Sequence, residues 1–501
     1  MFKSAHKFKK GEFLLPLILL VPMLILNVRN SQHWGDDFAV YVGQAINLLN
    51  GQAFDKTTYQ YIPGFSPLAP SAPVGFSILL MPVIKLFGVN MYAMSVYMSV
   101  FFILWMLFAF GFFRRFFGVP TALTALFVAA YPNFLLWLKL LITSDVPFAL
   151  FFLWACMILS KPHKNSSTYI IAGIITGIAT IIRPVGAILI PALFLFTVFE
   201  LVKDTAHRQN KTSIKQTAHL LVFSAIVLLL YSIAAYWLFK PEHSYVKSAI
   251  DSVHFKNLWI TARLNLPYYI SSYMALFKSD GSHLKTVSAI FAAAMLSGTI
   301  AGIIFRLLFK ASFFDWACVC YLAFIVFFPA GPDYRYIIPV HIFLIFYAFS
   351  AGKFFLQRFG RNHRGLLQVA FTLLTVIFFS KPILYLWEHR KDTVPGPYEE
   401  IATETFSYIK QNIPPASLII FNKPRALALF TGNRTTMGNF DLAPQINYTE
   451  LKSHGAGYYL YNWSIPDDSY AMFINTEKKN WEVVYQNWQY TLYKDTTINR
   501  P

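Results

Sequence analysis

Charged side chains are scarce in this chain: Asp, Glu, Lys and Arg together make up 13% of its 501 residues. Soluble globular proteins carry roughly 25%, whereas 56% of this sequence is hydrophobic. The composition excludes a soluble protein and predicts an integral membrane protein. The formal net charge of +18 would suit nucleic acid, but basic loops beside anionic headgroups explain it better. Membrane lipids, and not nucleic acid, are therefore the expected partners.

Cysteine is also rare, and the three cysteines, Cys156, Cys318 and Cys320, all lie within apolar runs. No disulfide framework is expected. Cys318 and Cys320 are two residues apart, a spacing that does not bring side chains together on a helix. The histidines show no His-x-x-x-His spacing, so a protein-built metal site is not indicated. A cleavable signal is not expected, because no Ala-x-Ala-like site follows the apolar run Phe13–Val28.

Apolar runs are abundant, and many approach the length that spans a hydrocarbon core of roughly 30 Å. About eleven are expected to be membrane helices: Phe13–Val28, Met91–Phe113, Thr121–Leu138, Val146–Ser160, Tyr169–Ile182, Val185–Leu201, Thr217–Phe239, Thr286–Phe309, Phe313–Ala330, Tyr336–Gly352 and Gly365–Phe379. Arg183-Pro184 is expected to break one long run into two helices. Val74–Gly88 contains Pro82 and Lys85, and is therefore expected to be interfacial or re-entrant. The predicted fold class is a polytopic α-helical membrane protein.

The distribution of basic residues supports this topology. With the N-terminus in the cytoplasm, nearly every predicted inner loop is basic, as the positive-inside rule requires. One predicted outer loop does not follow this rule, because residues 240–285 carry six Lys or Arg side chains. The expected location is a plasma membrane, the bacterial inner membrane, with everything after Lys381 outside the cytoplasm.

The composition after residue 382 resembles that of a soluble protein, with Pro395-Gly396-Pro397 marking a linker. The chain is therefore divided into a transmembrane part, 1–382, and an extracytoplasmic α/β domain, 383–501. Patterning predicts one amphipathic helix and four short strands there. These are Tyr398–Gln411 for the helix, and Ser417–Phe421, Gly457–Asn462, Glu482–Gln486 and Tyr490–Tyr493 for the strands.

Asp36 and Asp37 come shortly after the first apolar run, in the predicted outer loop 29–88. Desolvation and like-charge repulsion near a bilayer both oppose ionisation, so adjacent carboxylates tend to persist there only where they are used. They are the favoured chemical centre. A solvated loop start is the alternative interpretation.

Further polar residues are predicted on the same face, each with a structural alternative. Asp145 could cap the helix that begins beside it. Arg335 could be an interfacial anchor paired with Asp333. Lys85 and Arg183 could extend to the headgroups. Together, carboxylates, arginines and a lysine are the groups that glycosyl transfer with a phosphate leaving group requires.

Five sequence elements, in this order, carry a resemblance to a known family. They are Asp36-Asp37-Phe38-Ala39-Val40-Tyr41, Ala72-Pro73-Val74-Gly75-Phe76 with Lys85-Leu86-Phe87-Gly88, Ser144-Asp145-Val146-Pro147-Phe148, Ile181-Ile182-Arg183-Pro184 and Arg335-Tyr336-Ile337-Ile338-Pro339. They resemble elements of the GT-C superfamily of polyprenyl-phosphate-sugar-dependent glycosyltransferases, especially protein O-mannosyltransferases and lipid A aminoarabinose transferases. That family has Asp-Glu-x-x-Tyr where this chain has its acidic pair, so Asp37 stands for Glu, and Val74 replaces a proline. Pro414-Pro415 and Pro424-Arg425 are similar to segments of the family's C-terminal domain.

The resemblance implies an inverting transfer of a sugar from a polyprenyl-phosphate donor to a hydroxyl of a lipid, protein or glycan acceptor. It implies Asp36 as general base, with Asp37 and Asp145 orienting the base, binding sugar hydroxyls or holding a metal. The leaving phosphate would be met by Arg335, Lys85, Arg183 or a divalent cation. The implied substrate-binding residues are Tyr41 and Tyr336.

Two other functions compete with this interpretation. A transporter or flippase of lipid-linked sugars shares the helix number, but usually shows inverted repeats and matching broken helices, which this sequence lacks. It also leaves the acidic loop and the outer domain unexplained. A membrane-anchored scaffold would need a single span.

Overall fold

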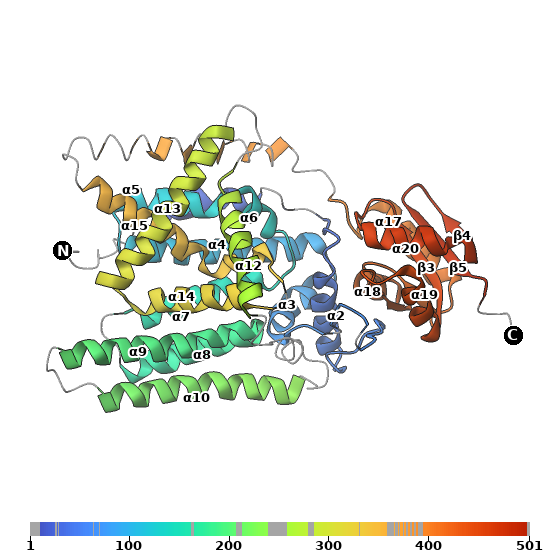
Figure 1. Cartoon of the computed structure of the whole chain (residues 1–501), viewed down its shortest axis with the longest axis horizontal. Helices are drawn as coiled ribbons and strands as arrows, with labels where there is room; N and C mark the ends of the chain where they lie inside the picture. The colour runs from blue at the N-terminus through green and yellow to red at the C-terminus, as the bar shows by residue number, and fades with distance from the viewer. Residues whose placement is uncertain are drawn as a thin grey trace.

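The structure is a computed structural model of the whole chain, divided into a helical part and a carboxyl-terminal part built on a small sheet (Figure 1). It describes residues 11–25, 28, 30–63, 65–69, 71–161, 165–206, 213–238, 258–278, 285–329, 331–357 and 394–497, with scattered residues between 365 and 388.

The helical part consists of apolar helices joined by short connections. In chain order these are α1 (Leu14–Leu20), η1 (Val21–Leu24), α2 (Asp37–Leu49), α3 (Val74–Phe87), α4 (Met91–Arg114), α5 (Val119–Ala130), α6 (Asn133–Leu138), α7 (Asp145–Leu159), α8 (Ser166–Ile182), η2 (Pro184–Ile188), α9 (Leu189–Ala206), α10 (Ser213–Leu238), α12 (Leu258–Ala275), α13 (Lys285–Phe309), α14 (Phe313–Phe327), η5 (Tyr334–Val340) and α15 (His341–Leu356).

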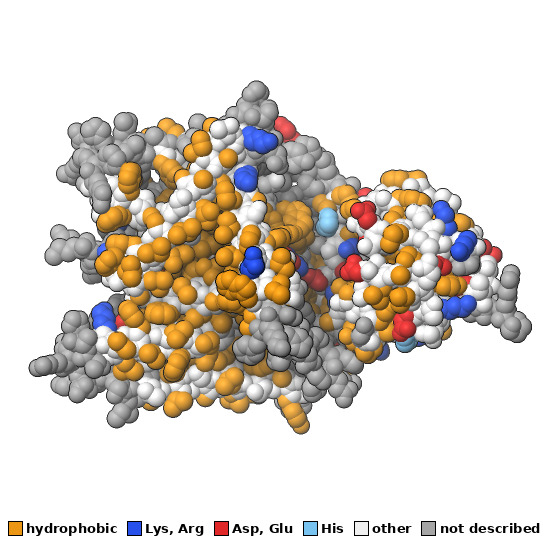
Figure 2. Space-filling view, in the orientation of Figure 1, with side chains coloured by type: hydrophobic (Ala, Val, Ile, Leu, Met, Phe, Trp, Pro, Cys, Tyr) orange, Lys and Arg blue, Asp and Glu red, His pale blue; other side chains and the backbone are white. Residues whose placement is uncertain are grey.

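Within the described ranges, five helical segments are long and apolar enough to cross a membrane, and six further apolar helices are shorter. The five are Met91–Arg114, Pro184–Lys203, Thr217–Tyr236, Lys285–Phe309 and Tyr334–Leu356. Apolar side chains dominate the visible face of the helical part, whereas charged side chains are more frequent on the carboxyl-terminal part (Figure 2). These features agree with a multi-pass membrane protein. The total of about eleven spans stays a prediction.

Two segments differ from the sequence-based expectation. Thr121–Leu138, predicted as one helix, is divided into α5 and α6, because Pro132 lacks the N–H that would continue the first helix. The predicted outer loop 240–285 contains the helix α12. Its polar Asn265 interrupts the apolar pattern by which a helix is predicted from the sequence. The Asn265 amide donates to the carbonyl oxygens of Ile325, Val326 and Phe328, at 3.3, 3.1 and 2.9 Å. Asn265 thereby satisfies carbonyls that the end of α14 leaves free. The predicted span Gly365–Phe379 lies largely outside the described residues.

The predicted break at Arg183-Pro184 is confirmed. Helix α8 ends at Ile182, and Arg183 adopts an extended conformation with φ −144° and ψ 122° before η2 begins. Helix α3 starts against this break, since a Cβ on Gly75 would lie 2.6 Å from the Ile182 nitrogen. Glycine therefore permits the close approach that sets the start of α3 beside Arg183.

The carboxyl-terminal part contains a five-stranded sheet in the order β2-β1-β3-β5-β4. Strand β1 pairs in parallel with β2 and β3, and β5 pairs antiparallel with β3 and β4. The elements are α17 (Glu400–Asn412), β1 (Leu418–Ile420), α18 (Pro424–Thr431), β2 (Arg434–Thr436), α19 (Pro444–Ser453), β3 (Ala456–Asn462), α20 (Asp468–Glu477), η6 (Lys478–Asn480), β4 (Trp481–Gln486) and β5 (Tyr490–Asp495). The four predicted strands and the predicted helix are all present. Strand β2 was missed because its three residues are polar and show no alternation.

The first loop joins the two parts of the molecule. Helix α18 packs against α2, which lies between the bundle and the sheet (Figure 1). Tyr59 forms an isolated parallel bridge with Thr435, and the Gln60 N–H donates to the Thr435 carbonyl oxygen at 2.7 Å. Trp34 packs edge to face on Phe421, with ring centroids 5.8 Å apart. The start of α2 therefore faces the carboxyl-terminal sheet.

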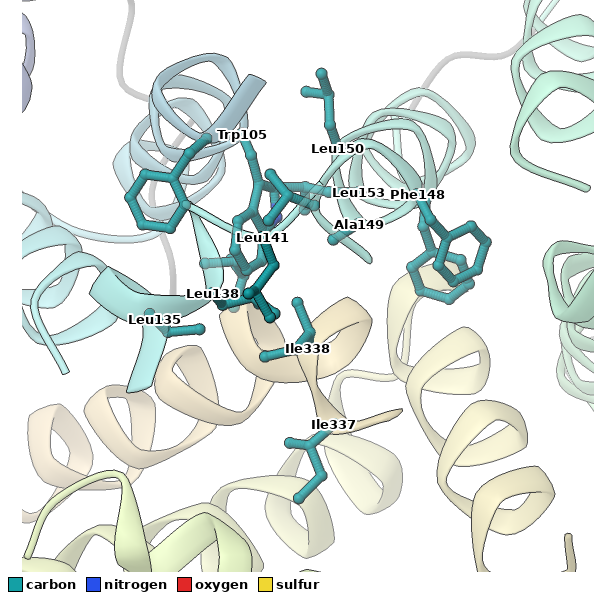
Figure 3. Packing of buried hydrophobic residues seen from close by; sticks show 14 of the residues in the cluster. Trp105, Leu135, Leu138, Leu141, Phe148, Ala149, Leu150, Leu153, Ile337 and Ile338 are labelled. Atoms are coloured by element: carbon teal, nitrogen blue, oxygen red, sulfur yellow. The ribbon is translucent and has the colours of Figure 1, made fainter. Parts of the chain in front are cut away.

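A buried apolar cluster joins several helices of the helical part (Figure 3). Trp105 of α4, Leu138 of α6, Phe148 of α7 and Ile338 of η5 are all fully or almost fully buried in it. Within a bilayer, such close packing holds helices together, because lipid tails remove most of the hydrophobic driving force. The cluster fixes α7 and η5, the two elements that begin with Asp145 and Tyr334-Arg335.

Candidate functional site

Of the acidic pair, Asp37 is more accessible to solvent than Asp36. It is the first residue of α2, and its side chain is 46% exposed. One carboxylate oxygen accepts from Arg335 Nη1 at 3.1 Å, and the other lies 3.4 Å from Arg425 Nη1. Partial burial alone would raise the pKa of Asp37, but Arg335 and then Arg425 lower it below the ordinary value. Asp37 therefore stays ionised and within reach of a ligand.

Asp36 has a different environment, although it precedes Asp37 directly. Its side chain is 8% exposed and accepts from the Ala426 N–H at 3.0 Å and the Arg425 N–H at 3.4 Å. Burial raises the pKa of Asp36, although Arg425 opposes this effect. The carboxylate of Asp36 is thus occupied by the first turn of α18.

Asp145 and Arg183 form a buried ion pair in which Arg183 Nη2 lies 2.8 Å from Asp145 Oδ1. Arg183 Nε also donates to the Ser144 hydroxyl at 2.8 Å, and that hydroxyl lies 3.0 Å from the Tyr41 hydroxyl. Burial raises the pKa of Tyr41 to about 12, so its hydroxyl keeps its proton at neutral pH. Asp145 lies in the first turn of α7, after the N-cap residue Ser144, but its carboxylate makes no capping hydrogen bond and pairs with Arg183 instead.

Arg335 joins these groups. Its Nε donates to Asp333 at 2.8 Å, its Nη1 donates to Asp37, and Nη1 lies 4.0 Å from Asp145. The Asp333 carboxylate also accepts the Arg335 backbone N–H at 2.8 Å, which fixes the start of η5. One guanidinium therefore meets three carboxylates, and an interfacial anchor alone would not need this arrangement.

Lys85 lies apart from this cluster, whereas Tyr336 directly follows Arg335 in η5. Lys85 is exposed in the last turn of α3, about 15 Å along the helix from Gly75 at 1.5 Å per residue. Tyr336 packs edge to face against Phe328, with ring centroids 5.9 Å apart. The structure thus brings together Asp36, Asp37, Tyr41, Asp145, Arg183 and Arg335 but not Lys85, and the role of Tyr336 in substrate binding stays a prediction.

Arg425 belongs to the cluster and was not predicted as a site residue. It enters from α18, 388 positions after Asp37 in the sequence. The signal available was the Pro424-Arg425 segment, whose similarity to the GT-C C-terminal domain said nothing about proximity to the acidic pair. Local spacing cannot reveal a contact made by folding two distant parts of a chain together.

Four carboxylates and three guanidiniums meet at this site: Asp36, Asp37, Asp145 and Asp333 with Arg183, Arg335 and Arg425. Within the described ranges, no group of three His, Cys, Asp or Glu side chains is arranged to hold a metal ion. An exposed carboxylate beside a guanidinium can accept a proton on one side and stabilise an anion on the other.

Residues 71–246 match the family described as dolichyl-phosphate-mannose-protein mannosyltransferase. No curated protein sequence matches the chain. Among solved structures, ArnT from Cupriavidus metallidurans bound to undecaprenyl phosphate is similar, with a TM-score of 0.58 and 13% identity over 99% of this chain and 100% of that chain. The archaeal oligosaccharyltransferase AglB from Archaeoglobus fulgidus, in complex with an inhibitory peptide and a dolichol-phosphate, has a TM-score of 0.57 and 14% identity over 98% of this chain and 74% of that chain.

The apo state of the same ArnT matches over 98% of this chain and 99% of that chain, with a TM-score of 0.54 and 14% identity. At these identities the structures show a shared fold alone. Together with the family match, they confirm the predicted resemblance to membrane glycosyltransferases of the GT-C type.

Proposed function

Because this chain has a GT-C fold and matches a mannosyltransferase family over part of its length, we propose that it transfers a sugar from a polyprenyl-phosphate donor to an acceptor hydroxyl. The proposal rests on one observation above all. The half-exposed carboxylate of Asp37 lies 3.1 Å from the guanidinium of Arg335, so a general base and a phosphate ligand are side by side.

Asp37, rather than Asp36, is the base in this proposal. Asp36 is buried and its oxygens accept backbone N–H groups of α18, so an acceptor hydroxyl has little access to it. Spacing supports the same assignment. If the acidic pairs are aligned, Asp37 stands for the Glu, but three residues rather than two then separate it from Tyr41. Counted back from Tyr41, the Asp-Glu-x-x-Tyr pattern of the GT-C family instead places Asp37 at the first acidic position and Phe38 at the second.

The proposed reaction is a single displacement that inverts the anomeric carbon. The acceptor hydroxyl gives its proton to Asp37 as its oxygen forms the new bond, and the bond from the anomeric carbon to the phosphate oxygen breaks. Lipid phosphate leaves with the electron pair. Protonation of Asp37 removes its negative charge at the moment when the leaving phosphate gains one. Arg335 can then exchange the carboxylate for the phosphate, which a guanidinium binds through two parallel hydrogen bonds.

The remaining polar residues hold this arrangement. Asp145 lies 2.8 Å from Arg183 and 4.0 Å from Arg335, and so orients the two guanidiniums toward the donor phosphate. Tyr41 keeps its proton and, through its contact with the Ser144 hydroxyl, supports the position of Arg183. Lys85 has no part in this mechanism, because it is exposed at the far end of α3.

The proposal is tested by incubating the purified protein with a panel of polyprenyl-phosphate sugars that carry hexoses, pentoses or amino sugars. Membrane lipids, peptides and glycans serve as acceptors. We expect one donor to release polyprenyl phosphate and to yield a product inverted at the anomeric carbon. Movement of intact donor across a vesicle membrane, with no transfer from any donor, would instead favour a flippase.

We also propose that residues 383–501 form a domain outside the cytoplasm. Gln445 is exposed in the helix α19 of the carboxyl-terminal part. Lys203 is exposed near the end of α9, on the predicted inner side. In intact cells, an impermeant thiol reagent should label Gln445→Cys, and it should label Lys203→Cys only after permeabilisation. The native cysteines in the unmodified protein provide the blank. The reverse labelling pattern would invert the proposed topology.

A further inference from the structure

Arg425 is carried to the polar cluster by the carboxyl-terminal sheet. It is the second residue of α18, the helix that packs against α2. Its side chain is 10% exposed, and its guanidinium lies over the ring of Tyr59, 5.9 Å from the centroid. A nearly buried arginine needs partners for its charge.

Those partners all belong to the first loop and the start of α2. Arg425 Nη2 donates to the Ala69 carbonyl oxygen, Nη1 contacts Asp37 at 3.4 Å, and Nε lies 3.8 Å from Asp36. Nε is buried and makes no hydrogen bond of its own. The guanidinium therefore divides its contacts between the two aspartates and a backbone oxygen.

Asp36 holds the segment that carries this arginine. Its two carboxylate oxygens accept the backbone N–H groups of Arg425 and Ala426, which are in the first turn of α18 and have no partner within the helix. The negative charge also faces the positive end of the helix dipole. Two successive backbone contacts fix the register of α18 against α2.

We infer that Arg425 is a positioning residue of the transfer site: Asp36 anchors it through α18, and it holds the Asp37 carboxylate ionised and aimed at the acceptor. The carboxyl-terminal part then completes the active site. The role of the arginine in transfer rests on the proposed function, whereas its electrostatic effect on Asp37 does not.

Every charged group that faces Asp37 contributes to this balance. Arg335 enters from η5, Arg183 from the end of α8, and Arg425 from α18, and all three favour the carboxylate. Asp36 is the adjacent like charge, and Asp145 and Asp333 contact the same Arg335; these three carboxylates oppose it. Loss of Arg425 leaves the other two arginines in place, so the site should survive with a less acidic Asp37.

The test measures the titration of Asp37 directly. A water-soluble carbodiimide modifies protonated carboxyl groups, and peptide mass spectrometry gives the modified fraction of Asp37 at each pH. In Arg425→Ala the midpoint should move to higher pH by about one unit, the lower end of the effect of a neighbouring arginine. In the transfer assay, the acidic limb of kcat against pH should move by the same amount. Arg425→Lys, which retains the charge, should restore most of both shifts.

Arg434→Ala is the matched control. Arg434 also projects from the sheet to the first loop, where it donates to the Gln60 side chain, but it contacts none of the site carboxylates. Its titration and rate profiles should match those of the native protein. If Arg425→Ala does not fold, Arg425→Met keeps the aliphatic stem beside Tyr59 and provides the same comparison.

Two outcomes would overturn the inference. One is an unchanged Asp37 midpoint in a folded Arg425 variant. The other is an Asp37 midpoint that moves upward equally in Arg425→Ala and in Arg434→Ala, which would indicate that both substitutions loosen the interface in general. Asp36→Asn should move the midpoint upward, because α18 loses its anchor; a downward shift would mean that Asp36 acts only as a neighbouring charge. Failure of every donor would refute the proposed function but would leave the carbodiimide result standing.

Discussion

Asp37→Asn should lower sugar transfer by about 10²–10⁴, the range typical for loss of a general base. Asparagine keeps the size of the side chain and can still accept from Arg335, but it cannot take the acceptor's proton. The measurement is the initial rate of polyprenyl phosphate release at saturating donor. Donor binding should be little changed, because the carboxylate is needed mainly in the transition state.

Asp36→Asn is the control for this prediction, since it changes the adjacent residue by the same chemistry. Asp36 is buried against α18, so its substitution should reduce transfer far less and should lower the stability of the α2–α18 contact. A dead Asp36→Asn beside an active Asp37→Asn would reverse the assignment of the base. Full activity in both folded variants would remove the enzymatic interpretation.

Arg183→Met should destabilise the protein by about 3–5 kcal/mol, the cost of leaving one partner of a buried ion pair without its counter-charge. Asp145 is 1% exposed and lies 2.8 Å from Arg183, and the more distant Arg335 at 4.0 Å offers only partial compensation. Thermal unfolding in detergent, with denaturant titration for the free energy, provides the measurement.

Two further variants distinguish this mechanism from a general loss of packing. Arg183→Met combined with Asp145→Leu should regain most of the lost stability, because no unpaired buried charge remains. Lys85→Met removes an exposed positive charge from α3 and should change the free energy of unfolding by less than about 0.5 kcal/mol. If Arg183→Met lowers the free energy of unfolding no more than Lys85→Met does, the ion pair contributes nothing to stability.

Helices and strands with a strong pattern were predictable from the sequence. The run that became α4 is apolar over its whole length, and the break at Arg183-Pro184 follows from the missing N–H of proline. Strands β3 and β5 are rich in tyrosine, which favours strands. In contrast, α12 and β2 contain polar residues whose partners are distant carbonyls and strands, so no local pattern marked them.

Most residues of the candidate site, but not Arg425, could be predicted from the sequence, whereas the contacts between them could not. Asp37, Asp145, Arg183 and Arg335 each lie beside a helix boundary, where polar residues interrupt long apolar runs, and this interruption is visible in the sequence. The division of roles between Asp36 and Asp37 was not visible, because the two residues are identical and adjacent. Burial by α18 on one side of the pair distinguishes them, and burial is a property of the tertiary structure.

The sequence by itself determined that this protein is helical, apolar and membrane-embedded, since low charge and long apolar runs act locally and need no partner. It also determined which side chains could carry charge near the membrane surface. The tertiary structure decided which of these charges meet. Arg425 reaches Asp37, and Lys85 does not, because the sheet packs on α2 while the axis of α3 carries Lys85 away. Electrostatic coupling depends on distance and burial, and neither follows from position along the chain.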